Sequence, residues 1–382
     1  MIVPTIAEVV LRGTGKPYTY VHDGAIMVEE AARKLLAGQD PYSVDYLGTP
    51  LFYWPMINNP ALYHFTYFPA LFLATAPFVA LFDRAGLFFD ERYLYLPAFL
   101  GAVAIVPLLL PKAPASYRLA LVAIVALDPQ LFPFVAEGRN DFFLLAFLFA
   151  GIALLQRERR TLGVLMIAIA ASAKLHAAVL LPFLALYLVW RARPRSLGGG
   201  LWDLTRASWA GAALLAIVFL PFLVWDLGGF LDDVVAYNAG GAAWSYPISG
   251  MGFSALLRTL GIISYPQQDF PFWAFQIVVG AGIAAVSLRR LRADPTIATL
   301  LASYAGTLLA FLFFGRYFQG NYLGYIVAVA APVPFLRPDL ATLAVARVRG
   351  MRPERTEVAP PPAVSVLAPV TLTPDAGESP AE

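Results

Sequence analysis

The polar residues that could do chemistry are concentrated in a few short segments of an otherwise apolar chain. The first segment is the triplet His22, Asp23 and Gly24. The residues after it, 25–37, have helical spacing and predict an amphipathic helix in the membrane interface. Asp23 stands where this helix should begin, so one interpretation is a cap that accepts a backbone N–H. The other is a general base that accepts a proton from a hydroxyl.

A second polar segment stands at the start of a long apolar run. Its residues are Glu137, Arg139, Asn140 and Asp141. An acidic residue at the head of a helix bundle is costly, which favours a role in a substrate cavity. Asp141 is a candidate to position the acceptor in a transfer reaction, or to bind a divalent cation. The alternative is an ordinary loop in which Asn140 or Asp141 caps the next helix.

Three cationic residues stand at predicted helix junctions. Lys174 and His176 lie between two short apolar runs, and Arg316 lies between two later ones. Cationic donors beside helix ends suit the phosphate of a lipid-linked donor. The alternatives are a lysine that reaches the membrane surface and an arginine that anchors the interface. In that case the tyrosines after Arg316 would form an aromatic belt: Tyr317, Tyr322 and Tyr325.

The segment 226–271 predicts a long external loop in which polar and aromatic residues alternate. Its candidate residues are Asp232, Asp233, Tyr237, Asn238, Trp244, Tyr246 and Gln267. Aromatic rings beside amides and carboxylates suit sugar recognition. The same composition is also typical of any external loop at a membrane interface.

The composition predicts that these residues are positioned by helices in a membrane. Hydrophobic residues make up 59% of the chain and charged residues only 14%, whereas soluble domains carry about 25% charged residues. Helices that cross lipid need about 20 mostly apolar residues. We therefore predict an all-α polytopic bundle of about nine or ten transmembrane helices. The nine clear apolar runs are 93–111, 118–136, 141–156, 161–174, 177–190, 207–225, 272–288, 296–314 and 320–336. A tenth run, 66–82, contains two prolines, and it either crosses or lies partly in the interface.

The distribution of Lys and Arg predicts the orientation, because short cytoplasmic loops are enriched in them. Most of the 27 basic residues fall on one side when 93–111 runs inward. This places the candidate site on the outer, periplasmic side of the plasma membrane. Residues 1–65 then form an external segment and 66–337 the transmembrane domain. The Pro- and Ala-rich stretch 338–382 is predicted to be a cytoplasmic, mostly disordered tail.

Several classes of function are excluded or disfavoured by composition. The chain has no cysteine, so a disulfide framework and a thiol nucleophile are excluded. A net charge of +2, spread over many short loops, disfavours nucleic acid as a partner. No Gly-rich phosphate loop is present. No spacing demands a metal, so we expect no cofactor, although a divalent cation would be compatible with Asp141.

At these residues the chain resembles the GT-C superfamily of membrane glycosyltransferases. The resemblance is strongest to glycosyltransferase family 87, the polyprenol-phosphate-mannose-dependent mannosyltransferases. It rests on the residues around the His22 triplet and on the segments 65–78 and 137–182, and it covers roughly residues 20–340 in order and hydropathy. The family implies a catalytic Asp in the first external loop, which falls on Asp23, with His22 beside it. It also implies a polar site at Lys174 and His176, and a polar cluster that matches Arg316, Asn321 and Tyr322.

The resemblance implies transfer of a sugar, mannose in this family, from a polyprenyl-phosphate donor to a glycan or glycolipid acceptor. We expect an inverting displacement in which Asp23 is the general base. Lys174, His176 and Arg316 would bind the donor phosphate, and membrane lipids would surround the protein. The main alternative is a polytopic transporter or lipid flippase, which should show internal repeats and charges in the middle of spans. A noncatalytic membrane subunit is the third possibility.

Overall fold

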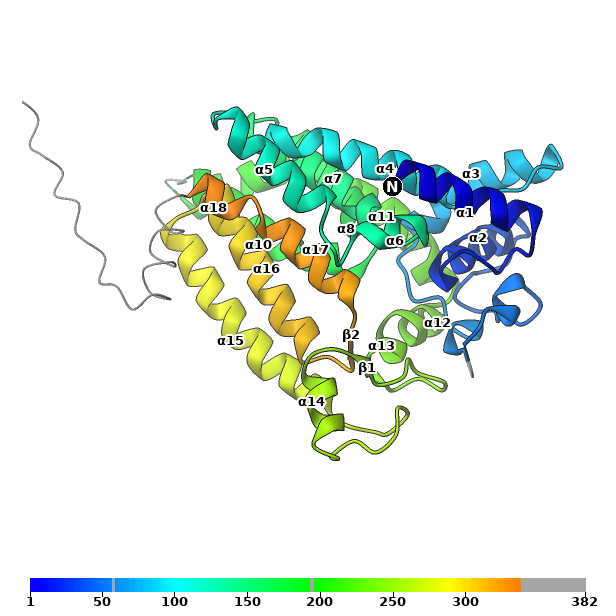
Figure 1. The fold of residues 1–382 in the computed structure, drawn as a ribbon. Helices are drawn as coiled ribbons and strands as arrows, with labels where there is room; N and C mark the ends of the chain where they lie inside the picture. The colour runs from blue at the N-terminus through cyan, green and yellow to red at the C-terminus, as the bar shows by residue number, and fades with distance from the viewer. Residues whose placement is uncertain (57–58, 193–195, 338–382) are drawn as a thin grey trace, which may run out of the picture. The chain divides into compact units, whose positions relative to one another are not determined.

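The fold is built from α-helices. The computed structural model describes residues 1–56, 59–192 and 196–337, all within one unit, and Figure 1 shows their helices. Four helical segments are long and apolar enough to cross a membrane: Arg92–Leu109, Leu175–Ala192, Gly198–Trp225 and Phe272–Ala293. The predicted class, an all-α multi-pass membrane protein, is confirmed. The predicted tail 338–382 lies outside the described residues.

Each apolar run predicted from the sequence contains a helix, but several helices are shorter than the runs. The long ones are α4 (Arg92–Ile105), α10 (Leu180–Ala192), α11 (Leu197–Trp225) and α15 (Phe272–Ala293). The 3₁₀ turn η3 (Val106–Leu109) extends α4, and the short helix α9 (Leu175–Ala178) precedes α10. The shorter ones are α3 (Ala70–Arg84), α5 (Ala115–Ala126), α6 (Phe132–Ala136), α7 (Asp141–Gln156), α8 (Arg160–Ala171), α16 (Ile297–Phe313), α17 (Gly320–Ala330) and α18 (Val333–Leu336).

Prolines account for the shortened helices. The run 118–136 is divided into α5 and α6 around Pro129, and the run 320–336 is divided into α17 and α18 at Pro332. Proline has no backbone N–H and its ring clashes with the preceding turn, so a helix ends or bends there. The run 66–82 forms α3, which contains Pro77 and is not among the segments long enough to span a membrane.

The predicted amphipathic helix is present but is enclosed by protein. It forms α2 (Asp23–Leu36), in which every residue from Gly24 to Ala32 is buried. Its acidic residue Glu29 pairs at 2.7 Å with Arg12 of α1 (Ile2–Thr14), and Arg12 also contacts Asp90 at 2.9 Å. Because these buried pairs cover the polar face, α2 differs from the expected interfacial helix. The 3₁₀ turns η1 (Pro50–Tyr53) and η2 (Pro60–Leu62) follow it.

The predicted loop 226–271 contains short elements that close over the ends of the helices. They are α12 (Leu227–Leu231), the π-helical turn η4 (Asp232–Ala236), α13 (Tyr237–Ala239), β1 (Ser249–Gly250) and α14 (Phe253–Thr259). Strand β1 pairs in parallel with β2 (Tyr317–Phe318), with Ser249 opposite Tyr317. The pairing ties the loop to the segment between α16 and α17, as Figure 1 shows.

Two glycines allow α7 and α8 to pack with their backbones almost in contact. A Cβ on Gly151 would lie 2.5 Å from Cγ1 of Ile167 and 2.7 Å from the carbonyl oxygen of Gly163. A Cβ on Gly163 would lie 2.9 Å from the carbonyl oxygen of Gly151. Small residues at such crossings are the usual means of close helix packing in membranes, where hydrophobicity does not drive association.

We predict that Gly151→Ala lowers the thermal stability of the detergent-solubilised protein. The added methyl group meets backbone atoms that cannot move aside, and overpacking of this kind costs about 1–3 kcal/mol. Gly101→Ala in α4 is the matched control, because a Cβ there meets nothing within 4 Å. Equal melting temperatures for the two variants would contradict the close crossing.

Candidate functional site

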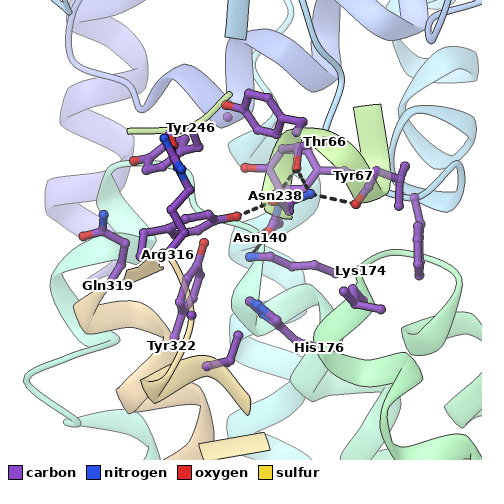
Figure 2. A pocket seen from close by; sticks show the side chains of 18 of the residues that line it. Thr66, Tyr67, Asn140, Lys174, His176, Asn238, Tyr246, Arg316, Gln319 and Tyr322 are labelled. Carbon is purple, nitrogen blue, oxygen red and sulfur yellow. Dashed lines mark hydrogen bonds between the residues drawn. The ribbon is translucent and has the colours of Figure 1, made fainter. Parts of the chain in front are cut away.

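One cavity brings together most of the polar residues that the sequence analysis selected. It has a volume of about 580 Å³, and it is lined by most of the candidate residues but not by Glu137, nor by Asp232, Asp233, Trp244 and Gln267 of the loop 226–271. The predicted residues that line it are His22, Asp23, Arg139, Asn140, Asp141, Lys174, His176, Arg316, Asn321 and Tyr322. In Figure 2, Arg316 and Tyr322 lie on one side of this space, and Lys174 and His176 lie on the other.

The cavity lies at one end of the helices, and the arginine-rich segments lie at the other. In α15 the lining residues are at the start of the helix, at Trp273 and Gln276, whereas Arg290 and Arg292 are in its last turn. In α16, which runs the other way, the lining residue Leu312 is near the end. This arrangement agrees with the predicted charge asymmetry along the helices.

The Asp141 carboxylate joins three helix starts at the cavity. It begins α7, and one of its oxygens lies 3.2 Å from Nζ of Lys174, just before α9. Its other oxygen accepts a hydrogen bond at 2.9 Å from Nδ2 of Asn321, in the first turn of α17. Arg139 extends the network by donating to Oδ1 of Asn321 at 3.3 Å and to Glu137 at 2.9 Å. Buried charges of this kind require pairing, and here each has partners.

Lys174 is more completely surrounded than the sequence suggests. Besides Asp141, its ammonium donates to Oδ1 of Asn140 at 3.1 Å. It also lies over two aromatic rings, 5.6 Å from the ring centre of Tyr67 and 5.4 Å from that of Tyr322. A cation over an aromatic face gains further electrostatic stabilisation. Lys174 therefore has protein partners on several sides, and it does not reach toward the membrane surface.

Asp23 lies at the first residue of α2, one position after the helix cap. The cap position is His22, and the N–H of Gly24 donates to the Asp23 carboxylate at 2.7 Å. The His22 ring nitrogen Nδ1 lies 2.8 Å from the Asp23 carboxylate. Burial acts to raise the pKa of Asp23, but His22, the Gly24 N–H and the charge of Arg139 together hold this pKa below its usual value. Asp23 is therefore an ionised carboxylate at neutral pH.

Arg316 is a buried cation whose hydrogen bonds go to backbone carbonyls. Its Nε donates to the carbonyl of Tyr246 at 2.5 Å, and the two terminal nitrogens reach the carbonyls of Gln268 and Pro266 at 3.5 Å. Within the described residues no carboxylate forms an ion pair with it, and burial lowers the pKa of its guanidinium against the opposing effect of the Asp269 charge. Gly240 lies against it with a φ of +93°, and a Cβ there would stand 2.5 Å from NH1 of Arg316. The site thus keeps one positive charge without a fixed anionic partner.

His176 presents an unpartnered ring nitrogen at the cavity. Its side chain is buried, and Nδ1 has no hydrogen-bond partner among the described residues. The ring packs edge-to-face on Tyr322 with the ring centres 4.5 Å apart. Its backbone carbonyl accepts from the hydroxyl of Tyr304 at 2.7 Å, which fixes the start of α9. A buried polar atom without a partner is uncommon and marks a position where a ligand group can bind.

Tyrosines form one wall of the cavity, and this wall was only partly anticipated. Ring centres are 6.2 Å apart for Tyr237 and Tyr246, 4.4 Å for Tyr246 and Tyr317, and 5.9 Å for Tyr317 and Tyr322. The belt considered for Tyr317, Tyr322 and Tyr325 is therefore wrong. Tyr317 and Tyr322 line the cavity, and Tyr325 is fully buried.

Tyr67, on the opposite side of the cavity, was missed as a site residue. Its hydroxyl would be 2.4 Å from a Cβ on Gly24, so it lies directly beside the start of α2. Its one sequence signal was its position in the motif 65–78, two residues before the proline that precedes α3.

One group of side chains has the composition of a metal site. His64, Asp232 and Asp233 bring their ligand atoms within 4.8 Å of one another. Both ring nitrogens of His64 already have partners, because Nδ1 lies 2.7 Å from Asp233 and Nε2 lies 2.5 Å from the carbonyl of Ala243. Asp233 also accepts from the N–H of Phe65 at 2.8 Å. These contacts indicate that His64 and Asp233 hold two segments of the chain together, and they favour this structural role over the binding of a cation.

The described helices and the cavity define a multi-pass membrane protein with a polar cavity at the ends of its helices. Residues 17–190 match the family described as "Alpha-(1->6)-mannopyranosyltransferase, N-terminal domain". The chain is also 24% identical over 354 residues to alpha-(1->6)-mannopyranosyltransferase A of Mycobacterium tuberculosis, which covers 86% of this chain and 63% of that protein. Both findings confirm the resemblance to GT-C mannosyltransferases. The chain spans less than two thirds of the relative's length.

We predict that Asp141→Asn strongly destabilises the protein, because it leaves the Lys174 ammonium buried without its counter-charge. Breaking a buried ion pair from one side costs about 3–5 kcal/mol. The double variant Asp141→Asn with Lys174→Gln should lose less stability than the two single variants added together, because neither charge is then left unpaired. Thermal unfolding in detergent measures the cycle. Additive losses would show that the two residues do not stabilise each other.

Proposed function

We propose that this protein is a membrane mannosyltransferase. In this proposal it transfers mannose from a polyprenyl-phosphate donor to a hydroxyl of a glycan or glycolipid acceptor. The observation that carries the proposal is the cavity, which is lined both by the Asp23 carboxylate and by the buried Arg316 guanidinium. The similarity to alpha-(1->6)-mannopyranosyltransferases supports the choice of sugar.

The anionic end of the donor is best matched by Arg316. A buried guanidinium that contacts only carbonyl oxygens has lost its hydration without gaining an opposite charge, and a phosphate supplies that charge with strong bidentate hydrogen bonds. His176 is a second group for this phosphate, because its Nδ1 has no protein partner. Lys174 was assigned the same role from the sequence. Its existing bonds to Asn140 and Asp141 favour instead a supporting role behind the phosphate.

The lipid chain of the donor fits the apolar part of the cavity. Arg316 stands three residues after the end of α16, and the cavity-lining residues of α16 and of the facing α15 are apolar apart from Gln276. The apolar ones are Trp273, Ile277, Leu308, Phe311 and Leu312. A phosphate at Arg316 therefore places an attached isoprenoid chain beside these helices. Burial of that chain contributes about 0.8 kcal/mol for each CH₂ group.

The reaction we propose is a direct displacement with inversion. Asp23 accepts the proton of the acceptor hydroxyl while that oxygen attacks the anomeric carbon. The bond from this carbon to the phosphate oxygen breaks, and the polyprenyl phosphate leaves with the electron pair, stabilised by Arg316 and His176. Tyr246 lies between the general base and the phosphate-binding group. Its carbonyl accepts a hydrogen bond from Arg316. Burial raises the pKa of its hydroxyl, and the negative charge of Asp23 raises it further.

We propose that the cavity faces the outside of the plasma membrane, toward the periplasm. The support is the positive-inside rule, because the arginines of α15 and those after α7 lie at the helix ends away from the cavity.

We expect no cofactor, although a divalent cation would be compatible with Asp141. Carriers usually place charges in the middle of spans, whereas Asp141, Lys174 and Arg316 lie at helix ends.

We predict that Asp23→Asn abolishes most sugar transfer from polyprenyl-phosphate mannose without preventing membrane insertion. The amide cannot accept the proton, and general-base assistance is worth about 10²- to 10⁴-fold in rate. Asp45→Asn is the matched control, because Asp45 is an exposed carboxylate in the same N-terminal segment. Normal transfer by the Asp23 variant would refute the mechanism and favour a transporter or a noncatalytic subunit.

We predict that Arg316→Gln raises the KM for the polyprenyl-phosphate donor roughly 10- to 100-fold, as expected for loss of a hydrogen bond to a charged group. Arg316→Lys should retain part of the affinity, because it keeps the positive charge. If Arg316 only anchored the loop through its carbonyl contacts, both variants would be equally impaired. Arg258→Gln is the control, since Arg258 is an exposed arginine of the loop 226–271, which Arg316 contacts through its carbonyls.

A further inference from the structure

An exposed aromatic pair lies outside the cavity and is not used by the proposed reaction. The rings of Tyr63 and Trp244 are stacked, with centres 5.6 Å apart and planes inclined by 20°. Tyr63 is 39% exposed and Trp244 is 59% exposed. Each ring therefore covers one face of the other and keeps an outer face open to a ligand.

The pair is held rigidly by buried contacts directly behind it. Tyr63 precedes His64, and Trp244 follows Ala243, and Nε2 of His64 lies 2.5 Å from the carbonyl of Ala243. The other nitrogen of His64 pairs with Asp233, which is buried in the π-helical turn η4. Trp244 has a φ of 60°, a left-handed conformation that residues other than glycine rarely adopt. The two rings are thus fixed before any ligand binds.

The aromatic pair is continuous with the tyrosine wall of the cavity. The ring of His64 lies 5.0 Å from that of Tyr237, which lines the cavity. Ala61 and Tyr246, two residues from Tyr63 and Trp244 respectively, also line it. A chain of linked sugars with one end in the cavity would therefore pass over these exposed rings on its way out.

We propose that Tyr63 and Trp244 form an outer subsite that binds a sugar ring of an oligosaccharide acceptor, at a distance from the hydroxyl that reacts. Aromatic faces bind the C–H faces of sugars, and rigid exposed rings do so at a low cost in conformational entropy. This inference rests on the proposed function and deepens it, because it makes the acceptor a chain of several sugars. Exposed Tyr and Trp also anchor proteins at membrane surfaces, but anchoring requires neither the buried contact of His64 with Asp233 behind the rings nor a strained backbone.

The test compares acceptors of different length with the purified full chain and polyprenyl-phosphate mannose. The acceptors are an octyl glycoside of one mannose and an octyl glycoside of four α-(1→6)-linked mannoses. Trp244→Asn removes the ring with a residue that tolerates the left-handed backbone. We expect it to raise the KM for the four-sugar acceptor roughly two- to tenfold and to leave the KM for the one-sugar acceptor unchanged. Trp244→Phe should retain most of the binding.

Tyr265→Asn is the matched control, because Tyr265 is 57% exposed in the same loop and should affect neither acceptor. A Trp244→Asn variant that impairs both acceptors equally, or neither, overturns the subsite. Calorimetric titration with free mannotetraose judges the subsite without catalysis: weaker binding by Trp244→Asn supports it, and unchanged or absent binding refutes it. If the wild-type protein transfers mannose to no acceptor, the proposed function fails independently of this result.

Discussion

The polar end of this molecule depends on the buried ion pair between Asp141 and Lys174. Neither charge is tolerable alone among apolar helices, so each must have a partner within reach. Because Asp141 begins α7, Lys174 precedes α9 and Asn321 stands in the first turn of α17, satisfying these groups fixes three helix starts around one point. The cavity exists because those helix starts meet there with their polar groups directed inward.

The polar groups of the cavity divide into those that hold the structure and those that are available to a substrate. Lys174 and Arg139 are engaged with carboxylates and amides of the protein. Arg316 contacts only carbonyls, and Nδ1 of His176 has no partner among the described residues. An electrostatic site of this kind stabilises charge that develops during a reaction, because its groups are oriented in advance. The surrounding pairs maintain that orientation.

The sequence predicts the helices and the polar segments well, for simple physical reasons. Apolar runs form helices in lipid because their backbone groups have no other way to be satisfied, and each run contains one. Their exact lengths were harder to predict, since Pro129 and Pro332 divide runs that hydropathy alone reads as continuous. The amphipathic helix over 25–37 was also predicted, but its burial was not. Its polar face is covered by the pairs that Arg12 forms with Glu29 and Asp90, and these residues are distant from one another in the sequence.

Residue types and spacing alone determined that this is a helical membrane protein, that its basic residues gather at one set of helix ends, and that its resemblance is to GT-C mannosyltransferases. Only the tertiary structure decided how the polar residues are used. It pairs Lys174 with Asp141, and it leaves Arg316 without an ion pair among the described residues. It also turns Tyr317 and Tyr322 from a supposed belt into a cavity wall. The physical reason is that hydropathy and charge follow from local composition, whereas the partner of a buried charge is set by which helix ends meet in space.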